Sequence, residues 1–152
     1  MLFRSNYRMT NIAAAIGFAQ IEHVHWHLER RHEIAGWYRE ALSGAPGISF
    51  QGEREWAGHA HWMITILVEE GVDRDQVMAR LLADGIETRP AFFPIHTLPP
   101  YRDTLGGTFP VAEDIGRRGI SLPTWAGLTP ADVRYIAECL ARAMSEARED
   151  DE

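Results

Sequence analysis

The sequence predicts an α+β fold, in which a long N-terminal helix precedes a small antiparallel or mixed sheet packed with helices. Three patterns indicate this fold. Apolar residues recur at helical spacing from Thr10 to Ser43, and residues 58–68 alternate as in a β-strand. A third stretch, from Thr129 to about Ala147, again has helical spacing and provides an apolar face that can cover the sheet.

Composition and charge exclude several classes of protein. The 152 residues are 45% hydrophobic and 24% charged, as expected for a globular domain. A formal net charge of −7 argues against a nucleic-acid-binding protein, which would normally carry a basic patch. No apolar run approaches the roughly 20 residues that cross a bilayer, and the first residues lack the layout of a signal peptide. The single cysteine, Cys139, cannot form an internal disulfide, so we expect a cytoplasmic protein without a membrane partner.

The first helix is expected to be capped by Thr10 or Asn11 and to end before the turn at residues 44–47. Gly17 or Gly36 could kink it or divide it into two consecutive helices. Its first half is apolar nearly all round, so it must be buried on most sides. We expect that cover to come from another subunit or from a domain outside this chain.

The sheet is expected to contain short strands, one of them at an edge. In the clearest strand, one face is wholly apolar from Ala60 and Trp62 through Val68 and should pack on helices. Pro90 is expected to end another strand. The predicted strands are residues 48–50, 58–68, 86–89 and 120–123.

Three helices are expected to surround the sheet. Asp73 resembles the first residue of a capping box for a helix over residues 74–84, with Val77, Leu81 and Leu82 toward the core. Pro110 suits the first turn of a helix that ends at Arg118. Thr129 should cap the last helix, after which the acidic residues 146–152 form a solvated, frayed tail. The core face of that last helix is Val133, Ile136, Ala137, Leu140 and Met144.

Two stretches carry groups suited to binding. Asn6, Tyr7 and Arg8 place an amide, a phenol and a guanidinium at a helix head, which suits a phosphate. The alternative is that Asn6 caps the chain entry and Arg8 lies on the surface.

The second stretch is the stiff loop over residues 88–96, which leaves a strand end, where α/β proteins commonly place ligand groups. Phe92 and Phe93 cannot both point inward if this segment is extended, which favours a ligand or partner surface. The alternative is a packed hydrophobic loop with a structural Arg89.

The histidines and the cysteine are weaker candidates. His23 and His27 lie one helical turn apart, and His59 and His61 share a predicted strand face; both spacings can bind a metal. No carboxylate or cysteine pattern completes a ligand set, so we expect solvated or locally hydrogen-bonded histidines and no metal site. Cys139 is expected to be a small core residue, because no base accompanies it.

Three blocks of the sequence resemble one family. They read NYRMTNIAAAIGFAQIEHV followed by RRHEIAGWYREAL, then LLADGIETRPAFFPIHTLPPY, and finally SLPTWAGLTPADVRYIAECL. In this order they are similar to the pyridoxal-phosphate-dependent sugar aminotransferases of the DegT/DnrJ/EryC1/StrS family, in particular to perosamine-synthase-like members. The resemblance covers essentially the whole chain.

The resemblance implies the C-terminal portion of a fold-type-I aminotransferase. The implied parts are an interdomain helix region (1–45), a small α/β domain (46–147) and an acidic tail (148–152), with the large cofactor domain absent. The sequence contains no lysine, whereas the cofactor of this family forms a Schiff base with one. We therefore expect a fragment, a truncated reading frame or a split gene that is inactive alone.

The resemblance also implies roles for individual residues. The asparagine that matches Asn6 reaches the cofactor phosphate of the other subunit of a homodimer, and the arginine that matches Arg8 lies near the phosphates of the nucleotide-sugar. The loop that matches Phe92 to His96 lines the substrate pocket. Arg89 and His96 are expected to contact substrate, although either could hold the loop in shape instead. Family members often have an aromatic residue or histidine where this chain has Ala91.

The implied reaction moves an amino group from glutamate to the cofactor and then to the keto carbon of a nucleotide-linked 4-keto-6-deoxy sugar. Residues of this chain would bind and orient, and none would be catalytic. Two alternatives stay open. One is a non-enzymatic dimerising or regulatory module derived from the family, and the other is an unrelated α/β domain whose histidines bind a metal.

Overall fold

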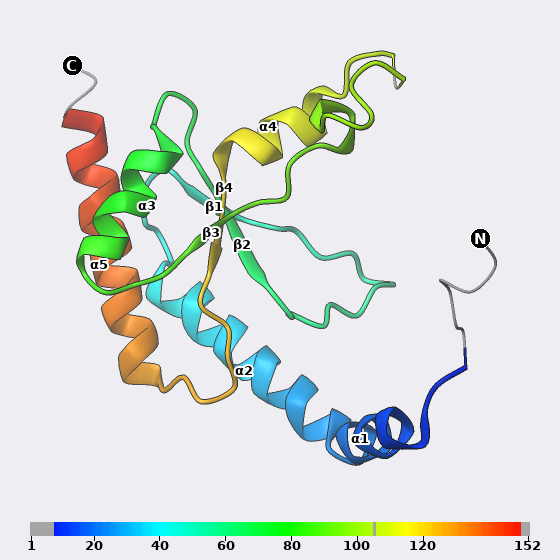
Figure 1. Ribbon diagram of the computed structural model, residues 1–152. Helices are drawn as coiled ribbons and strands as arrows, with labels where there is room; N and C mark the ends of the chain where they lie inside the picture. The colour runs from blue at the N-terminus through cyan, green and yellow to red at the C-terminus, as the bar shows by residue number, and fades with distance from the viewer. Residues whose placement is uncertain (1–7, 105, 150–152) are drawn as a thin grey trace.

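The computed structural model describes residues 8–104 and 106–149, and within them the expected α+β fold is confirmed (Figure 1). The elements are α1 (Asn11–Glu22), α2 (Val24–Ala41), β1 (Ile48–Phe50), β2 (Ile64–Val68), α3 (Arg74–Ala83), β3 (Arg89–Pro90), the 3-10 helix η1 (Ile95–Thr97), α4 (Pro110–Arg118), β4 (Gly119–Leu122) and α5 (Pro130–Glu149).

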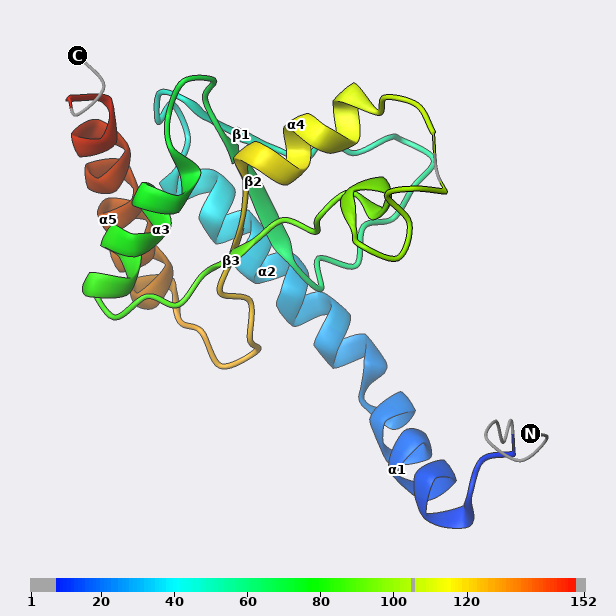
Figure 2. The same ribbon diagram turned by 45° about the horizontal axis from the view of Figure 1, so that its top comes forward.

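The strands form one antiparallel sheet in the order β1-β2-β4-β3. Its centre is the β2–β4 pair, where Ile66 lies opposite Ile120. Since β2 and β3 both run antiparallel to β4, they are parallel to each other, and α3 makes the crossover between them. Helices α3 and α5 lie on one side of the strands and α4 lies on the other (Figures 1 and 2).

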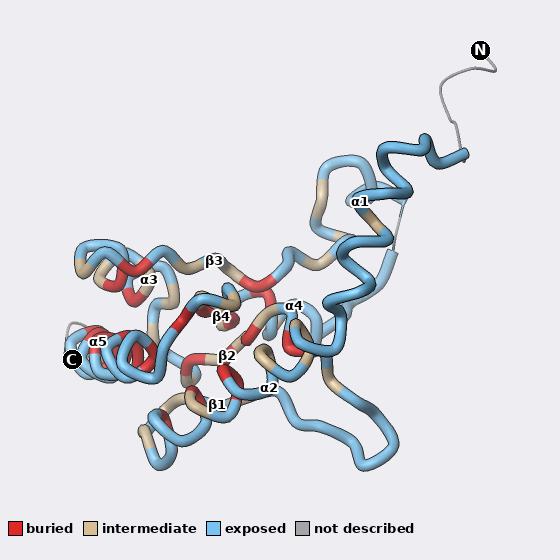
Figure 3. The backbone as a smooth tube through the Cα atoms, turned by 90° about the horizontal axis from the view of Figure 1, so that it is seen from below, coloured by how far each residue is buried: buried red, intermediate tan, exposed pale blue. Residues whose placement is uncertain are grey.

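The core lies between the sheet and the layer of α2, α3 and α5. Buried segments gather there, whereas α1 is exposed along its length (Figure 3). Tyr38 of α2 is completely buried, and its hydroxyl donates to the carbonyl oxygen of Pro123 at 3.0 Å. Burial raises the pKa of the Tyr38 hydroxyl far above its ordinary value. The largest fully buried side chains are Tyr38, Ile34, Ile66, Leu81, Ile120, Leu140 and Met144.

The N-terminal helical stretch consists of two helices that meet at His23, not at Gly17 or Gly36. The predicted cap is confirmed, because Thr10 Oγ1 accepts a hydrogen bond from the Ala13 amide at 3.2 Å. No residue of α1 is buried by the described part of the chain. Cover for this helix from a subunit or another domain stays a prediction, as does the division of the chain at residue 45. Its large exposed apolar side chains are Ile12, Ile16, Phe18 and Ile21.

Two predicted strands have the wrong extent. The strand expected over residues 58–68 covers only Ile64–Val68, because His61 adopts a left-handed backbone with φ 45° that a strand cannot contain. Trp62 is therefore 59% exposed and not on the buried face. The strand expected over residues 86–89 is the two-residue β3, and Pro90 belongs to it. An edge strand tolerates proline because the missing N–H faces away from the ladder.

The helices of the second half begin where the sequence predicts. Asp73 accepts hydrogen bonds from the amides of Asp75 and Gln76, and α4 begins at Pro110. Leu82 is wrong as a core residue, since it is 63% exposed.

The C-terminal helix also begins as predicted but ends later. The Thr129 hydroxyl accepts a hydrogen bond from the Asp132 amide, and the predicted core face of α5 is buried. The expected frayed tail is wrong up to residue 149, because α5 continues to Glu149 with Ala147 buried and Arg148 paired with Glu69.

Leu81 and Leu82 provide a matched test of this packing. Leu81→Ala should lower the free energy of unfolding by about 3 kcal/mol, because it opens a cavity in the core. Leu82→Ala, one residue away and exposed, should change it by less than about 0.5 kcal/mol. Urea denaturation of both variants measures the difference, and equal losses would contradict the assigned face of α3.

Candidate functional site

The predicted ligand loop leaves β3 and is held against α4 and β4. The Ala91 amide donates to the carbonyl oxygen of Gly119 at 2.9 Å. Pro94 lies so close to α4 that a Cβ on Gly116 would come within 2.8 Å of its ring. The glycine is therefore required for this close approach, and the loop has little freedom where it crosses the helix.

His96 makes contacts that hold the loop in shape. Its side chain is 14% exposed, and its Nε2 lies 2.9 Å from Glu113 Oε1 on α4. Glu113 also accepts from the Phe109 amide at 3.0 Å, and the His96 ring packs 4.8 Å from the Phe109 ring. The Phe109 amide and then His96 lower the pKa of Glu113. Of the two roles considered for His96, these contacts favour the structural one.

Phe92 and Arg89 are presented outward. Phe92 is 72% exposed and stacks on Trp62, with ring centroids 6.1 Å apart. Phe93 is exposed as well, as expected for a ligand or partner surface. The Arg89 side chain is 77% exposed, and its guanidinium lies 3.7 Å from the Glu87 carboxylate. The structure thus brings a guanidinium, a carboxylate and two stacked aromatic rings to one region of the sheet edge.

A groove of about 770 Å³ lies between residues 85–89 and residues 121–136. Exposed aromatic rings line it together with Arg89, namely Trp62, Trp125 and Tyr135. Such a combination suits a ligand that has both a planar or sugar ring and an anionic group.

An arginine of α2 holds the far wall of this groove. Arg30 Nε donates to the carbonyl oxygen of Ala126 at 2.9 Å, and its Nη2 donates to that of Leu128 at 2.6 Å. The same guanidinium lies over the Trp37 ring at 4.7 Å. The loop that carries Trp125 is therefore anchored to α2.

Sequence reasoning missed the two groove tryptophans. The alternating pattern predicts Trp62 on a buried strand face, because that pattern does not reveal the left-handed turn at His61. Trp125 stands in a short connection between Pro123 and Gly127, and a large aromatic residue in such a turn was an available signal for an exposed site.

The head of α1 lies apart from this groove. Arg8 is exposed just before the Thr10 cap, while Asn6 and Tyr7 lie outside the described residues. Helix α1 sits at the far end of α2, away from the loop over residues 91–109 (Figures 1 and 2). Within the described residues of one chain, the start of α1 is therefore not brought to the sheet edge formed by β3.

The histidine pairs do not form a metal centre in the part of the chain that the structure describes. There, no group of three or more His, Cys, Asp or Glu side chains could hold a metal ion. Cys139 is buried in α5, as expected. Among the described helices, none has both the length and the apolarity to cross a membrane.

The comparisons with known proteins point to one family. The family model of the DegT/DnrJ/EryC1/StrS aminotransferases matches residues 2–141. The chain belongs to this family. It is 42% identical over 147 residues to the GDP-perosamine synthase of Caulobacter vibrioides, which covers 91% of the chain and 38% of that protein. It is 40% identical over 138 residues to the GDP-perosamine synthase of Vibrio cholerae, and this match covers 89% of the chain and 37% of that protein. The chain thus spans less than two-fifths of these relatives and matches their C-terminal part.

Solved structures agree with this assignment. DesI, solved in the presence of its TDP-sugar product, superimposes with a TM-score of 0.85 at 30% identity. The match covers 93% of this chain and 37% of the DesI chain. Helicobacter pylori PseC, an aminotransferase involved in the biosynthesis of pseudoaminic acid, also superimposes with a TM-score of 0.85, and the match covers 93% of this chain and 39% of PseC. At 21% identity, this similarity shows the fold alone. The predicted C-terminal portion of a sugar aminotransferase is confirmed, and the family depends on pyridoxal 5′-phosphate.

Glu113→Gln tests the role of the His96 contact. The substitution weakens the charge-assisted bonds to His96 and Phe109, so the loop over residues 91–109 should open more often. Because the chain has no lysine, trypsin cleaves it only after arginine, and cleavage after Arg102 should become about twofold to fivefold faster. Glu138→Gln, on the exposed side of α5, is the control. Unchanged cleavage in Glu113→Gln would show that this contact does not hold the loop.

Proposed function

We propose that this chain forms the C-terminal part of a pyridoxal-phosphate-dependent enzyme that transfers an amino group, taken from glutamate, to a nucleotide-linked 4-keto-6-deoxy sugar. The supporting observation is the match of nearly the whole chain, in order, to the C-terminal part of GDP-perosamine synthases. These relatives favour a GDP-linked sugar as the substrate. The proposal places the enzyme in the cytoplasm as a homodimer.

The cofactor would be held mainly by residues outside this sequence. The 152 residues contain no lysine, so the lysine that holds the cofactor must come from elsewhere, and the chain would be inactive alone. When bound, the cofactor supplies the electron sink for amino transfer. Within the described residues, the positive end of helix α1 offers the chemistry that the cofactor phosphate needs, while Arg8 is left for the phosphates of the nucleotide-sugar.

The separation of the two binding regions supports a site shared between subunits. Helix α1 lies at the far end of α2 from β3 (Figures 1 and 2), so in this conformation one chain does not bring the start of α1 and β3 to one ligand. In the proposed dimer, Asn6 of one subunit contacts the cofactor phosphate of the other, and Arg8 contacts the nucleotide-sugar phosphates. The exposed apolar side chains of α1 would be covered in the same assembly.

The groove beside Arg89 would receive the nucleotide-sugar. Arg89 offers charge-assisted hydrogen bonds to an anionic group, and Phe92 with Trp62 offers apolar surface to a ring. Because His96 is engaged with Glu113, its contribution to binding would be indirect. The chain would contribute to catalysis by positioning the substrate.

A direct test of the proposed function supplies the family's cofactor domain on a separate polypeptide. The chain is assayed with pyridoxal 5′-phosphate, glutamate and a GDP-linked 4-keto-6-deoxy sugar, first alone and then with a polypeptide that carries the family's cofactor domain. Amino-sugar product only in the combined sample would support the proposal, and product from the chain alone would contradict it. Binding to the cofactor-domain polypeptide without product would favour the second candidate, a regulatory or dimerising module, which the absence of lysine also favours.

Arg89→Ala tests the substrate groove in the active assembly. Loss of a charged contact to substrate should raise KM for the nucleotide-sugar about tenfold to a hundredfold. Arg134→Ala, an exposed arginine of α5 outside the groove, is the matched control. Steady-state kinetics measure the effect, and equal KM values for the two variants would remove Arg89 from the substrate site.

Asn6→Ala tests the contribution to the cofactor site. In the active assembly it should weaken binding of pyridoxal 5′-phosphate about tenfold through loss of a hydrogen bond to a charged group. Asn11→Ala changes the chain's other asparagine, at the start of α1, and is the control. Absorbance titration with cofactor measures the affinities, and an unchanged affinity in Asn6→Ala would rule out the phosphate contact.

A further inference from the structure

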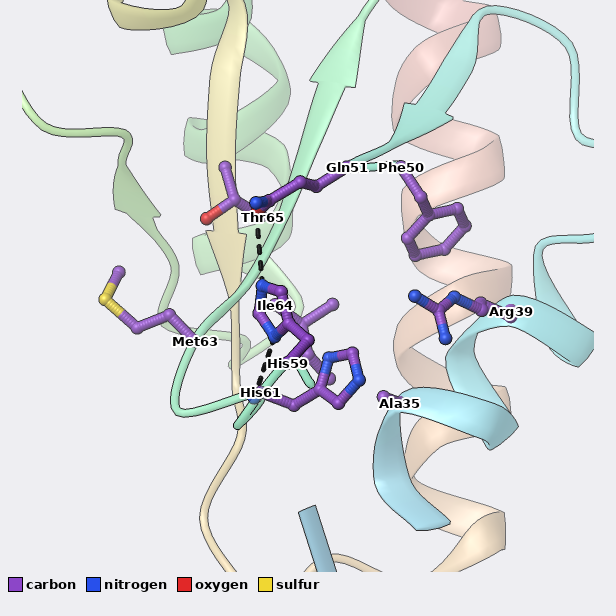
Figure 4. A pocket seen from close by; sticks show the side chains of 9 residues that line it. All are labelled: Ala35, Arg39, Phe50, Gln51, His59, His61, Met63, Ile64 and Thr65. Carbon is purple, nitrogen blue, oxygen red and sulfur yellow. Dashed lines mark hydrogen bonds between the residues drawn. The ribbon is translucent and has the colours of Figure 1, made fainter. Parts of the chain in front are cut away.

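A cluster of three imidazoles, those of His32, His59 and His61, joins α2 to the irregular segment over residues 53–62. Figure 4 shows His59 and His61 on the side of that segment that faces Arg39 of α2. At its centre, the His61 side chain is only 6% exposed, and its Nε2 lies 3.2 Å from Glu53 Oε1. The same carboxylate oxygen accepts from Arg39 Nη2 on α2 at 2.5 Å. Among the described residues other than glycine, His61 alone has a positive φ. A strained residue whose side chain is buried in a polar network indicates a defined role for that side chain.

The neighbouring imidazole, that of His59, contacts His61 and Gln51 through its two ring nitrogens. Its ring stacks on His61 at 4.3 Å, and its Nδ1 accepts a hydrogen bond from the His61 amide at 2.9 Å. A nitrogen that accepts carries no proton, so Nε2 carries it and donates to Gln51 Oε1 at 3.3 Å.

Trp62, which contacts α2 and the loop after β4, is the next residue along the chain after His61. The Trp62 carbonyl oxygen accepts from Arg31 Nη1 of α2 at 2.8 Å and from the Thr124 hydroxyl at 3.1 Å. Its ring stacks on Phe92 and lines the groove. The imidazole cluster therefore lies at the base of the segment that places Trp62 in the groove.

We propose that His61 is a positioning residue and the centre of a pH-sensitive latch: its neutral imidazole holds residues 53–62 on α2 and seats Trp62 against Phe92, and its protonation releases the segment. The latch does not depend on the proposed reaction. Only its consequence for substrate binding rests on that function.

The charges around His61 determine the direction of the switch. His32 and Arg39 face it from α2, His32 edge-on at 5.0 Å, while His59 and Glu53 face it from its own segment. Burial and then His59 lower the pKa of His61, Arg39 and His32 act in the same direction, and Glu53 opposes them. A lowered pKa in the closed state means that the open state binds the proton more tightly. The latch is fully stable above pH 6.5, the ordinary histidine value, and weakens as pH falls through the lowered pKa of His61.

Hydrogen exchange of the 152-residue chain tests this latch at pH 7.5 and pH 5.5. Each amide rate in residues 53–62 is divided by its intrinsic rate at that pH, which gives the opening equilibrium. In the unmodified chain the opening should increase at pH 5.5, by up to about tenfold per pH unit for one proton. In His61→Asn the opening should be the same at both pH values, since asparagine tolerates the left-handed backbone and does not titrate.

Two further variants make the test specific. His25→Asn removes an exposed histidine of α2 outside the cluster and should leave the pH dependence intact. His59→Gln removes a group that lowers the pKa of His61, so the pH dependence should become smaller, and this variant carries the test if His61→Asn does not fold. The proposal is overturned if normalised exchange of residues 53–62 is independent of pH in the unmodified chain. It is equally overturned if His61→Asn, or His59→Gln in its place, retains the full pH dependence.

The consequence for binding is tested separately in the active assembly. KM for the nucleotide-sugar should rise at pH 5.5 relative to pH 7.5, and this rise should be smaller in His61→Asn than in His25→Asn. Hydrogen exchange needs no substrate, so it separates failure of the latch from failure of the proposed function. If the latch is wrong, exchange of residues 53–62 does not depend on pH. If the proposed function is wrong, the assembly shows no turnover while the pH-dependent exchange persists. An equal rise of KM in both variants would separate the latch from substrate binding and contradict its role in positioning Trp62.

Discussion

The packing of α2 against the sheet and α5 is the interaction on which the rest of the structure depends. One side of this helix is in the core, where Ile34 and Tyr38 are almost completely buried. Three arginines elsewhere on the same helix hold two loop segments. Arg30 anchors the loop of Trp125, Arg31 anchors the carbonyl of Trp62, and Arg39 pairs with Glu53. The groove is thus built partly from irregular segments, and their contacts to α2 hold two of these segments in place.

This arrangement explains why the two ends of the helical stretch α1–α2 differ in burial. The C-terminal half of α2 has its own core and needs no further cover. Helix α1 continues beyond that core and exposes four large apolar side chains, those of Ile12, Ile16, Phe18 and Ile21. A short helix is only marginally stable in water without packing, and an exposed apolar patch of this kind marks an interaction surface. In the proposed assembly this surface is buried, and the residues before α1 reach a second subunit. The far position of Arg8 and the apolar surface of α1 therefore have one explanation.

Sequence patterns could predict the elements whose order follows from local chemistry. The caps at Thr10, Asp73 and Thr129 and the proline at the start of α4 are recognisable because each satisfies backbone groups of its own helix. The patterns failed where long-range contacts decide the backbone. At His61 the alternating pattern predicts a strand, but the contacts to α2 and Glu53 favour a left-handed turn.

The candidate site shows the same division. Arg89 and Phe92 were identified from the loop that follows a strand, and both prove exposed beside a groove. His96 could not be assigned from sequence, since its role depends on Glu113, seventeen positions away along the chain. Trp62 was missed because its exposure follows from the turn at His61. The imidazole cluster is likewise visible only in three dimensions, since it joins His32 on α2 to residues 53–61.

The most direct test of the central claim is a crystal structure of the cofactor-loaded assembly with a nucleotide-linked keto sugar. Our account predicts that Arg89 and Phe92 of one subunit contact the nucleotide-sugar, and that Asn6 and Arg8 approach the same site from the partner subunit. A nucleotide-sugar bound without contact to residues 85–96 of this chain, or Asn6 and Arg8 of the same chain at that site, would contradict it.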